Sequence, residues 1–232
     1  MINRELYMEQ ITPFIDKPFV KVITGIRRCG KSVVLRLIRE ELLRRGVSED
    51  YIIYMNFESF EWIDMKEAKA LYAHIREATK GSGKYYILLD EIQEVTDWEK
   101  AVNAFLVDLD VDIYVTGSNS RLLSSEFSTY LAGRYVAFHI MTLSFREYLL
   151  FHDLPLTISV SDRKTEFLKY LRMGGFPAIH TANYDYNAIY KIVYDIYSSV
   201  ILRDTVQRHS IRNVEMLERV VNINTQKFTD FL

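Results

Sequence analysis

The sequence predicts an α/β fold of three layers, with a parallel sheet between two layers of helices and a small helical domain after it. Five apolar segments rich in β-branched and aromatic residues alternate with segments whose apolar residues recur at helical spacing. The segment before Asp90 is almost continuously apolar, as a strand is when helices cover both faces of a parallel sheet. After residue 143 only helical periodicity remains. We expect strands at 19–24, 51–57, 85–91, 112–117 and 135–141.

Composition predicts a cytoplasmic globular protein with no membrane segment. Of its 232 residues, 49% are hydrophobic and 26% are charged. The 29 Lys and Arg residues nearly balance the 31 Asp and Glu residues, and a formal net charge of −2 gives no overall electrostatic argument for DNA binding. A single cysteine rules out an internal disulfide framework, and no apolar run approaches the roughly 18 residues of a membrane span. The five histidines lack the spacing of a metal cluster.

Residues 25–32 carry the clearest functional pattern, which is Gly, four free positions and Gly-Lys-Ser. This is the phosphate-binding loop, in which glycines let the backbone N–H groups turn toward a polyphosphate. A predicted strand precedes the loop and a helix with apolar residues at helical spacing follows it, as the motif requires. The helix start adds its positive dipole end. The domain is therefore expected to be a P-loop NTPase, with ATP or ADP bound by Gly25, Ile26, Arg27, Arg28, Cys29, Gly30, Lys31, Ser32 and Val33.

Four side chains have the chemistry of a hydrolytic site. Lys31 is expected to place its charge between the β- and γ-phosphates, and the Ser32 hydroxyl to ligate Mg²⁺. Asp90 and Glu91 end a buried strand, at the edge of the sheet where ligands bind in open α/β folds. We expect Asp90 to hold Mg²⁺ beside Ser32. Glu91 is expected to point to the other face of the strand end and to orient a water for attack.

Four further residues have a functional and an ordinary interpretation. Ser118 and Asn119 follow the fourth strand and could sense the γ-phosphate, or they could form a simple polar turn. Arg134 precedes the fifth strand and could complete the active site of a neighbouring subunit, or it could be a solvated surface residue. Cys29 could act as a redox switch, although a tolerated small residue explains it more simply.

The chain divides into three predicted parts. A P-loop core covers 1–143 and a helical domain covers 144–210. The second part begins at Ser144, which forms a capping-box pattern with Glu147. A third segment, 211–232, stops without a capping glycine or polar tail, so we expect the chain to be a piece of a longer protein.

Six motifs together resemble the prokaryotic ATPases that have an AAA-type core and a C-terminal DUF4143 region. The motifs are residues 25–32, 88–93, 116–123, 131–134, 144–148 and 174–177. The resemblance implies the sheet order 5-1-4-3-2, a helical lid and, in 211–232, the start of a winged-helix-like segment, with the DUF4143 region absent from this chain. It also implies that Arg134 is a finger acting between subunits, and that Asn56 restrains Glu91 until a ligand binds.

The leading hypothesis is an Mg²⁺-dependent ATPase of AAA type that couples ATP binding and hydrolysis to a conformational change. The alternative is a slowly hydrolysing, nucleotide-gated interaction or DNA-associated module, because the same residues would bind nucleotide in both cases. A P-loop kinase is a weaker hypothesis, since an acid beside Asp90 suits activation of water better than transfer to an acceptor. Arg134 makes a homo-oligomer possible, and DNA binding has no support from charge.

Overall fold

The computed structural model describes residues 4–118, 130–181 and 184–198, together with 122, 206, 211, 213, 215–217 and 219. Five strands form one sheet in the order β2-β3-β4-β1-β5, and every pairing is parallel. This confirms the expected order 5-1-4-3-2, which is the same order counted from the other edge. The strands are β1 Val20–Gly25, β2 Ile52–Asn56, β3 Tyr85–Asp90, β4 Val111–Ser118 and β5 Tyr135–Ile140.

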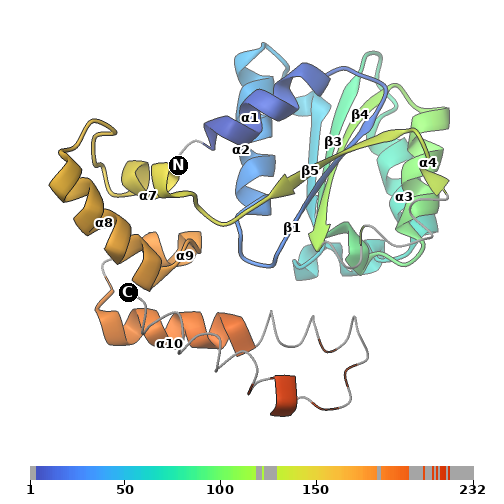
Figure 1. Cartoon of the computed structure of the whole chain (residues 1–232). Coiled ribbons are helices and arrows are strands. Elements are labelled where there is room, and N and C mark those ends of the chain that lie inside the picture. Colours follow the sequence, from blue (N-terminus) through green and yellow to red (C-terminus); the bar gives the residue numbers. More distant parts are fainter. Residues whose placement is uncertain are drawn as a thin grey trace.

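Helices cover both faces of the sheet and give the three predicted layers (Figure 1). Helices α1 (Glu5–Ile11) and α2 (Lys31–Arg44) lie on one face, and α3 (Ala68–Ala78) and α4 (Trp98–Asp108) lie on the other. Side chains of β3 alternate between the two cores, so Leu88 packs with residues of α2 while Leu89 packs with residues of α3 and α4. Asp90 therefore ends β3 on the same face as Leu88, toward α2.

Short 3₁₀ helices lie in four of the connections between these elements. They are η1 Thr12–Phe14, η2 Glu49–Tyr51, the longer η3 Phe60–Met65 and η4 Ile92–Glu94. Among them η4 matters most for the site, because it follows β3 directly and carries the residues after Glu91. Within the described residues, no helix is both long and apolar enough to cross a membrane.

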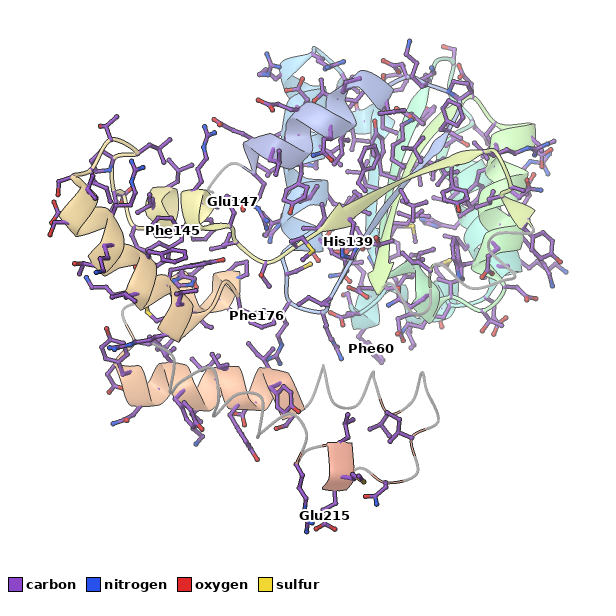
Figure 2. All side chains as sticks on the ribbon, viewed as in Figure 1. Phe60, His139, Phe145, Glu147, Phe176 and Glu215 are labelled. Atoms are coloured by element: carbon purple, nitrogen blue, oxygen red, sulfur yellow. The ribbon has the colours of Figure 1, made fainter. Side chains whose placement is uncertain are left out.

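The chain after β5 forms the helices α7 Phe145–Phe151, α8 Val160–Met173, α9 Pro177–His180 and α10 Tyr186–Ile196. The predicted capping box is confirmed: the Ser144 hydroxyl accepts the N–H of Glu147 at 3.3 Å, and the Glu147 carboxylate accepts the N–H of Ser144 at 2.8 Å. Phe145 lies on α7 (Figure 2). Its ring packs edge-on against Phe167 of α8, with ring centroids 5.1 Å apart. The domain boundaries at 143 and 210 stay predictions, and most of 211–232 lies outside the described residues.

Candidate functional site

The loop at 25–32 has the strand–loop–helix setting that its sequence requires. A Cβ at Gly25 would lie 2.3 Å from the carbonyl oxygen of Ile140, so only glycine lets β1 approach β5 this closely. Gly30 has φ 106°, a conformation open to glycine, and it turns the chain into α2. The side chains of residues 26–28 are exposed, whereas Cys29 is buried, and burial raises the pKa of its thiol. A buried thiol with a raised pKa fits the simpler interpretation of Cys29 as a small packed residue.

Lys31 joins the loop to the end of β3. Its ammonium is buried at the start of α2 and lies 3.4 Å from Glu91 Oε1 and 3.4 Å from the carbonyl oxygen of Ile26. The contact follows from the topology, because only β4 separates β1 from β3 and the carboxyl ends of all three strands meet at one edge. The structure thus brings together the two motifs that the sequence placed at a hydrolytic site.

Asp90 is fully buried and held by two hydroxyl groups. The phenol of Tyr54 donates to Oδ2 at 3.1 Å, and the hydroxyl of Thr116 on β4 donates to Oδ1. Burial, reinforced by the carboxylate, raises the pKa of Tyr54, so this phenol stays a donor. Thr116 also accepts the backbone N–H of Glu91 at 2.9 Å. Sequence reasoning missed Thr116, because threonine in a strand is ordinarily explained by its β propensity.

Glu91 takes its direction from a left-handed backbone conformation and from its neighbours. Strand β3 ends at Asp90 and Glu91 has φ 54°, so the alternation of strand side chains does not decide where its carboxylate lies. The amide of Gln93 donates to Glu91 Oε2 at 2.5 Å. The side chain of Asn56, which the resemblance implied as the partner, instead accepts the N–H of Glu58 at 3.0 Å. In this structure the hydrogen bond on Glu91 therefore comes from Gln93.

Ser32 and Asp90 offer the oxygen ligands that Mg²⁺ prefers. Among the residues that the structure describes, no group of three or more His, Cys, Asp or Glu side chains could hold a metal ion alone. A single hydroxyl and a single buried carboxylate suit Mg²⁺, which is usually held by one or two protein oxygens together with water and substrate phosphates. The residues present therefore fit the predicted ion.

A cavity of about 370 Å³ opens beside the phosphate loop. It lies between the loop and the helices after β5, and its lining residues are Arg4, Gly30, Val33, Phe151, Pro177, His180 and Thr181. Cavities of this size hold small-molecule ligands. His180 and His152 meet through Nδ1 and Nε2 at 3.1 Å, while His180 Nε2 lies 2.7 Å from the carbonyl oxygen of Gly174.

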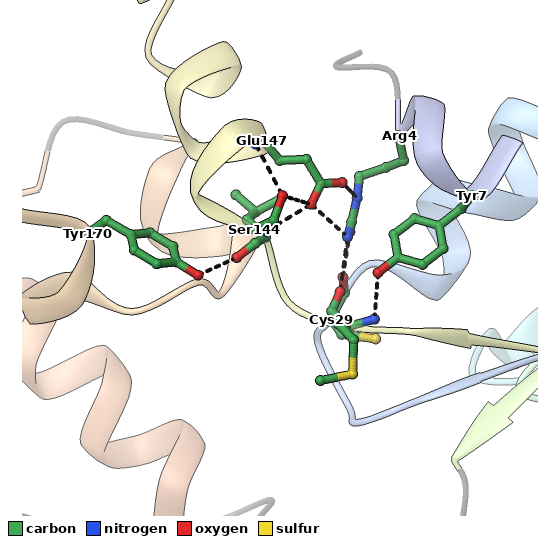
Figure 3. A network of polar contacts seen from close by, with 8 residues as sticks. Arg4, Tyr7, Cys29, Ser144, Glu147 and Tyr170 are labelled. Atoms are coloured by element: carbon green, nitrogen blue, oxygen red, sulfur yellow. Dashed lines mark hydrogen bonds and ion pairs between the residues drawn. The ribbon is translucent and has the colours of Figure 1, made fainter. Parts of the chain in front are cut away.

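Arg4 connects the phosphate loop to the helical part of the chain (Figure 3). Its buried guanidinium donates to the carbonyl oxygens of Cys29 at 3.1 Å and Met141 at 3.0 Å, and forms an ion pair with Glu147 of α7. The same Glu147 carboxylate closes the capping box of Ser144. One side chain before α1 is thus bonded to the loop, to the segment after β5 and to the first helix beyond the sheet.

Arg134 lies at the other end of the sheet from this cluster. It is exposed, donates to Asn103 Oδ1 at 3.0 Å, and comes just before β5. Since Tyr135 pairs with Val20 and Ile140 pairs with Gly25, the length of a strand, about 20 Å, separates Arg134 from the loop of its own chain. The side chain of Ser118 and all of Asn119 lie outside the described residues, so the predicted phosphate sensor has no structural description.

One family model and two known proteins match this chain. The model of a family described as AAA domain matches residues 17–149. An uncharacterized protein of Haemophilus influenzae is 39% identical over 222 residues, which are 95% of this chain and 54% of that protein. The uncharacterized protein MJ1544 of Methanocaldococcus jannaschii is 34% identical over 235 residues, covering 99% of this chain and 50% of that protein. The chain spans about half the length of these relatives.

A solved structure shares the fold at low sequence identity. A variant of RuvB from Thermotoga maritima superposes with a TM-score of 0.50 and 12% identity, over 96% of this chain and 70% of that one. At this identity the likeness concerns the arrangement of helices and strands.

Proposed function

The chain belongs to the AAA domain family, and on this premise we propose that it is a cytoplasmic, Mg²⁺-dependent ATPase that converts ATP and water to ADP and phosphate. The observation that carries the proposal is the contact between Lys31 and Glu91. It places an acid beside the ammonium that belongs to the phosphate-binding motif, one residue after a buried aspartate. Phosphate binding and activation of water need these groups within reach of one another.

Each residue has a defined part in the proposed reaction. The loop amides and Lys31 would hold the phosphates, while Ser32 and Asp90 would hold Mg²⁺, which supplies positive charge to the phosphate oxygens. When Lys31 turns to the phosphates, its ion pair with Glu91 is given up and Oε1 becomes available to a water molecule. Glu91 then acts as a general base. Sensing of the γ-phosphate by Ser118 or Asn119 remains a prediction.

The cavity beside Gly30 supports a proposal for the rest of the nucleotide. A nucleoside that lies there would touch the loop on one side and Phe151 and Pro177 of the helical part on the other. Arg4 already bonds the loop to α7. We infer that nucleotide binding changes the contacts between the phosphate loop and the helical part of the chain. ATP turnover would drive a conformational change through these contacts.

The test compares Glu91→Gln with Glu94→Gln, an exposed acid on the same turn. Glu91→Gln should lower kcat for ATP hydrolysis by about 10²- to 10⁴-fold, the usual contribution of a general base, while ATP still binds. Glu94→Gln should hydrolyse like the wild type. Steady-state phosphate release and equilibrium binding of a fluorescent ATP analogue measure the two effects. Undiminished hydrolysis by Glu91→Gln would remove Glu91 from the mechanism.

Lys31→Ala tests the phosphate loop separately. The loss of the buried ammonium should abolish detectable nucleotide binding, because Lys31 is the residue of the motif that places a charge between the β- and γ-phosphates. The fluorescent analogue used for Glu91→Gln reports this directly. Unchanged affinity would show that nucleotide binds elsewhere.

The restraint on Glu91 favours a second candidate function, a nucleotide-gated module that hydrolyses slowly. Both carboxylate oxygens are engaged, Oε1 by Lys31 and Oε2 by Gln93, so a resting state is built into the site. Multiple-turnover kinetics separates the candidates, since a gated module would retain ADP after one turnover. Phosphate release without any acceptor would count against a kinase. DNA binding stays a prediction, to be tested by the salt dependence of binding to the full-length protein.

A further inference from the structure

The Gln93 side chain lies between Glu91 and the end of β4. It belongs to η4, the turn that follows Glu91, and its Nε2 donates to Glu91 Oε2 at 2.5 Å. The orientation of the amide follows from its partner, because a carboxylate paired with Lys31 accepts hydrogen bonds and cannot donate one to Oε1 of the glutamine.

Gly117 provides the space that Gln93 fills. A Cβ built on Gly117 would lie 2.0 Å from Gln93 Oε1, closer than any real contact allows. Gly117 lies in a regular strand, so its small size, and not an unusual backbone conformation, is what this position needs. The amide is therefore confined between the β4 backbone on one side and the Glu91 carboxylate on the other.

Folding alone does not explain a glutamine at this position. Gln93 Oε1 is buried and receives no hydrogen bond within the described part of the chain. Burying an amide oxygen without a donor is unfavourable, and such atoms are rare in folded proteins. The hydrogen bond to Glu91 is thus the single polar contact of this side chain among the described residues, which points to a role exerted through Glu91.

We propose that Gln93 is a positioning residue for the general base Glu91. The inference rests on the proposed ATPase function. Gln93 holds Oε2 before and after Lys31 leaves, so that Oε1 keeps its direction when it becomes available. Oε1 then takes a proton from water, the water oxygen bonds to the γ-phosphorus, and the bond from that phosphorus to the bridging oxygen breaks with its electron pair leaving on ADP.

The experiment measures kcat, KM and thermal unfolding for Gln93→Leu, with Gln10→Leu, an exposed glutamine of α1, as control. Gln93→Leu should lower kcat about 10- to 100-fold, as loss of a supporting contact to a functional group typically does. KM should stay within about twofold, since the phosphate-binding groups are untouched. The melting temperature should be unchanged or higher, because a buried unpaired amide oxygen is removed. Gln10→Leu should leave kcat at the wild-type value.

The same change in a Glu91→Gln background decides whether Gln93 acts through Glu91. There, Gln93→Leu should cause no further loss of the residual hydrolysis, because the base it positions is already gone. An equal loss in both backgrounds, or a lowered melting temperature, would assign Gln93 a structural role and overturn the inference. Wild-type kcat in Gln93→Leu would overturn the inference alone. Nucleotide binding without hydrolysis by the wild type would overturn the ATPase proposal and this inference with it.

Discussion

Thr116 is a single hydroxyl that serves both acids of the candidate site. It donates to Asp90 and accepts the backbone N–H of Glu91, and it is completely buried. Thr116 thereby fixes Asp90 through the Asp90 carboxylate and Glu91 through the Glu91 backbone N–H.

Thr116→Val keeps the shape of this side chain and removes its hydrogen bonds. The N–H of Glu91 is then left without its acceptor, so we expect the free energy of unfolding to fall by about 1–3 kcal/mol. Urea denaturation measures this change. Thr165→Val, at an exposed position of α8, should cost clearly less. Equal costs at the two positions would contradict the role given to Thr116.

His180 makes stability depend on pH. Burial lowers its pKa below 6.5, so between that lowered pKa and 6.5 the unfolded chain binds more protons than the folded chain. The free energy of unfolding should therefore fall as pH drops below 6.5, and it should not recover at lower pH. The measurement is denaturation of wild type and His180→Gln from pH 8 to pH 5. The wild type should lose stability relative to the variant on acidification, and a difference independent of pH would refute the prediction.

Elements far apart in the sequence are joined by the ion pair of Arg4 and Glu147. Helix α7 begins with a capping box, and the carboxylate that closes the box also faces Arg4. The first turn of α7 is thereby tied to the N-terminal segment and, through the Cys29 carbonyl, to the phosphate loop. The Glu147 carboxylate therefore caps α7 and also connects the helical part of the chain, through Arg4, to the phosphate loop.

Arg4→Met should destabilise the protein by about 3–5 kcal/mol, because it leaves the buried Glu147 carboxylate without its cation. Arg44→Met, which breaks an exposed pair with Glu41, should cost about 1 kcal/mol or less. Glu147→Gln keeps an oxygen for the capping box and should fall between the two. Denaturant titration of the three variants gives the order, and an Arg4→Met cost no larger than that of Arg44→Met would contradict it.

At the scale of the whole molecule, Arg134 and the phosphate loop occupy opposite ends of the sheet. A finger in its own active site is excluded by the length of the strands. The exposed position remains compatible with the proposal that Arg134 reaches the site of a neighbouring subunit in an oligomer.

Subunit mixing tests this proposal. Arg134→Ala and Lys31→Ala should each be inactive alone, and their mixture should regain ATPase activity where an intact loop meets an intact Arg134. A mixture of Lys31→Ala with the Lys31→Ala, Arg134→Ala double variant is the control and should stay inactive. Light scattering with ATP analogue bound reports the oligomer. If the first mixture gains nothing, Arg134 is a surface residue, the alternative that the sequence left open.

The sequence alone determined the succession of strands and helices along the chain, the phosphate loop and the two acids at the end of β3. These follow from local patterns, because apolar periodicity sets the elements and glycines set the loop. Convergence of the motifs was also predictable, since parallel strands end at one edge of the sheet.

Only the tertiary structure decided which polar atoms meet there. Gln93 holds Glu91, Thr116 serves Asp90, Arg4 pairs with Glu147 and His152 meets His180. These contacts depend on side-chain directions and on distances of a few ångströms. The periodicity of a sequence assigns a residue to a helix or a strand, but it does not say which distant residue its side chain will contact.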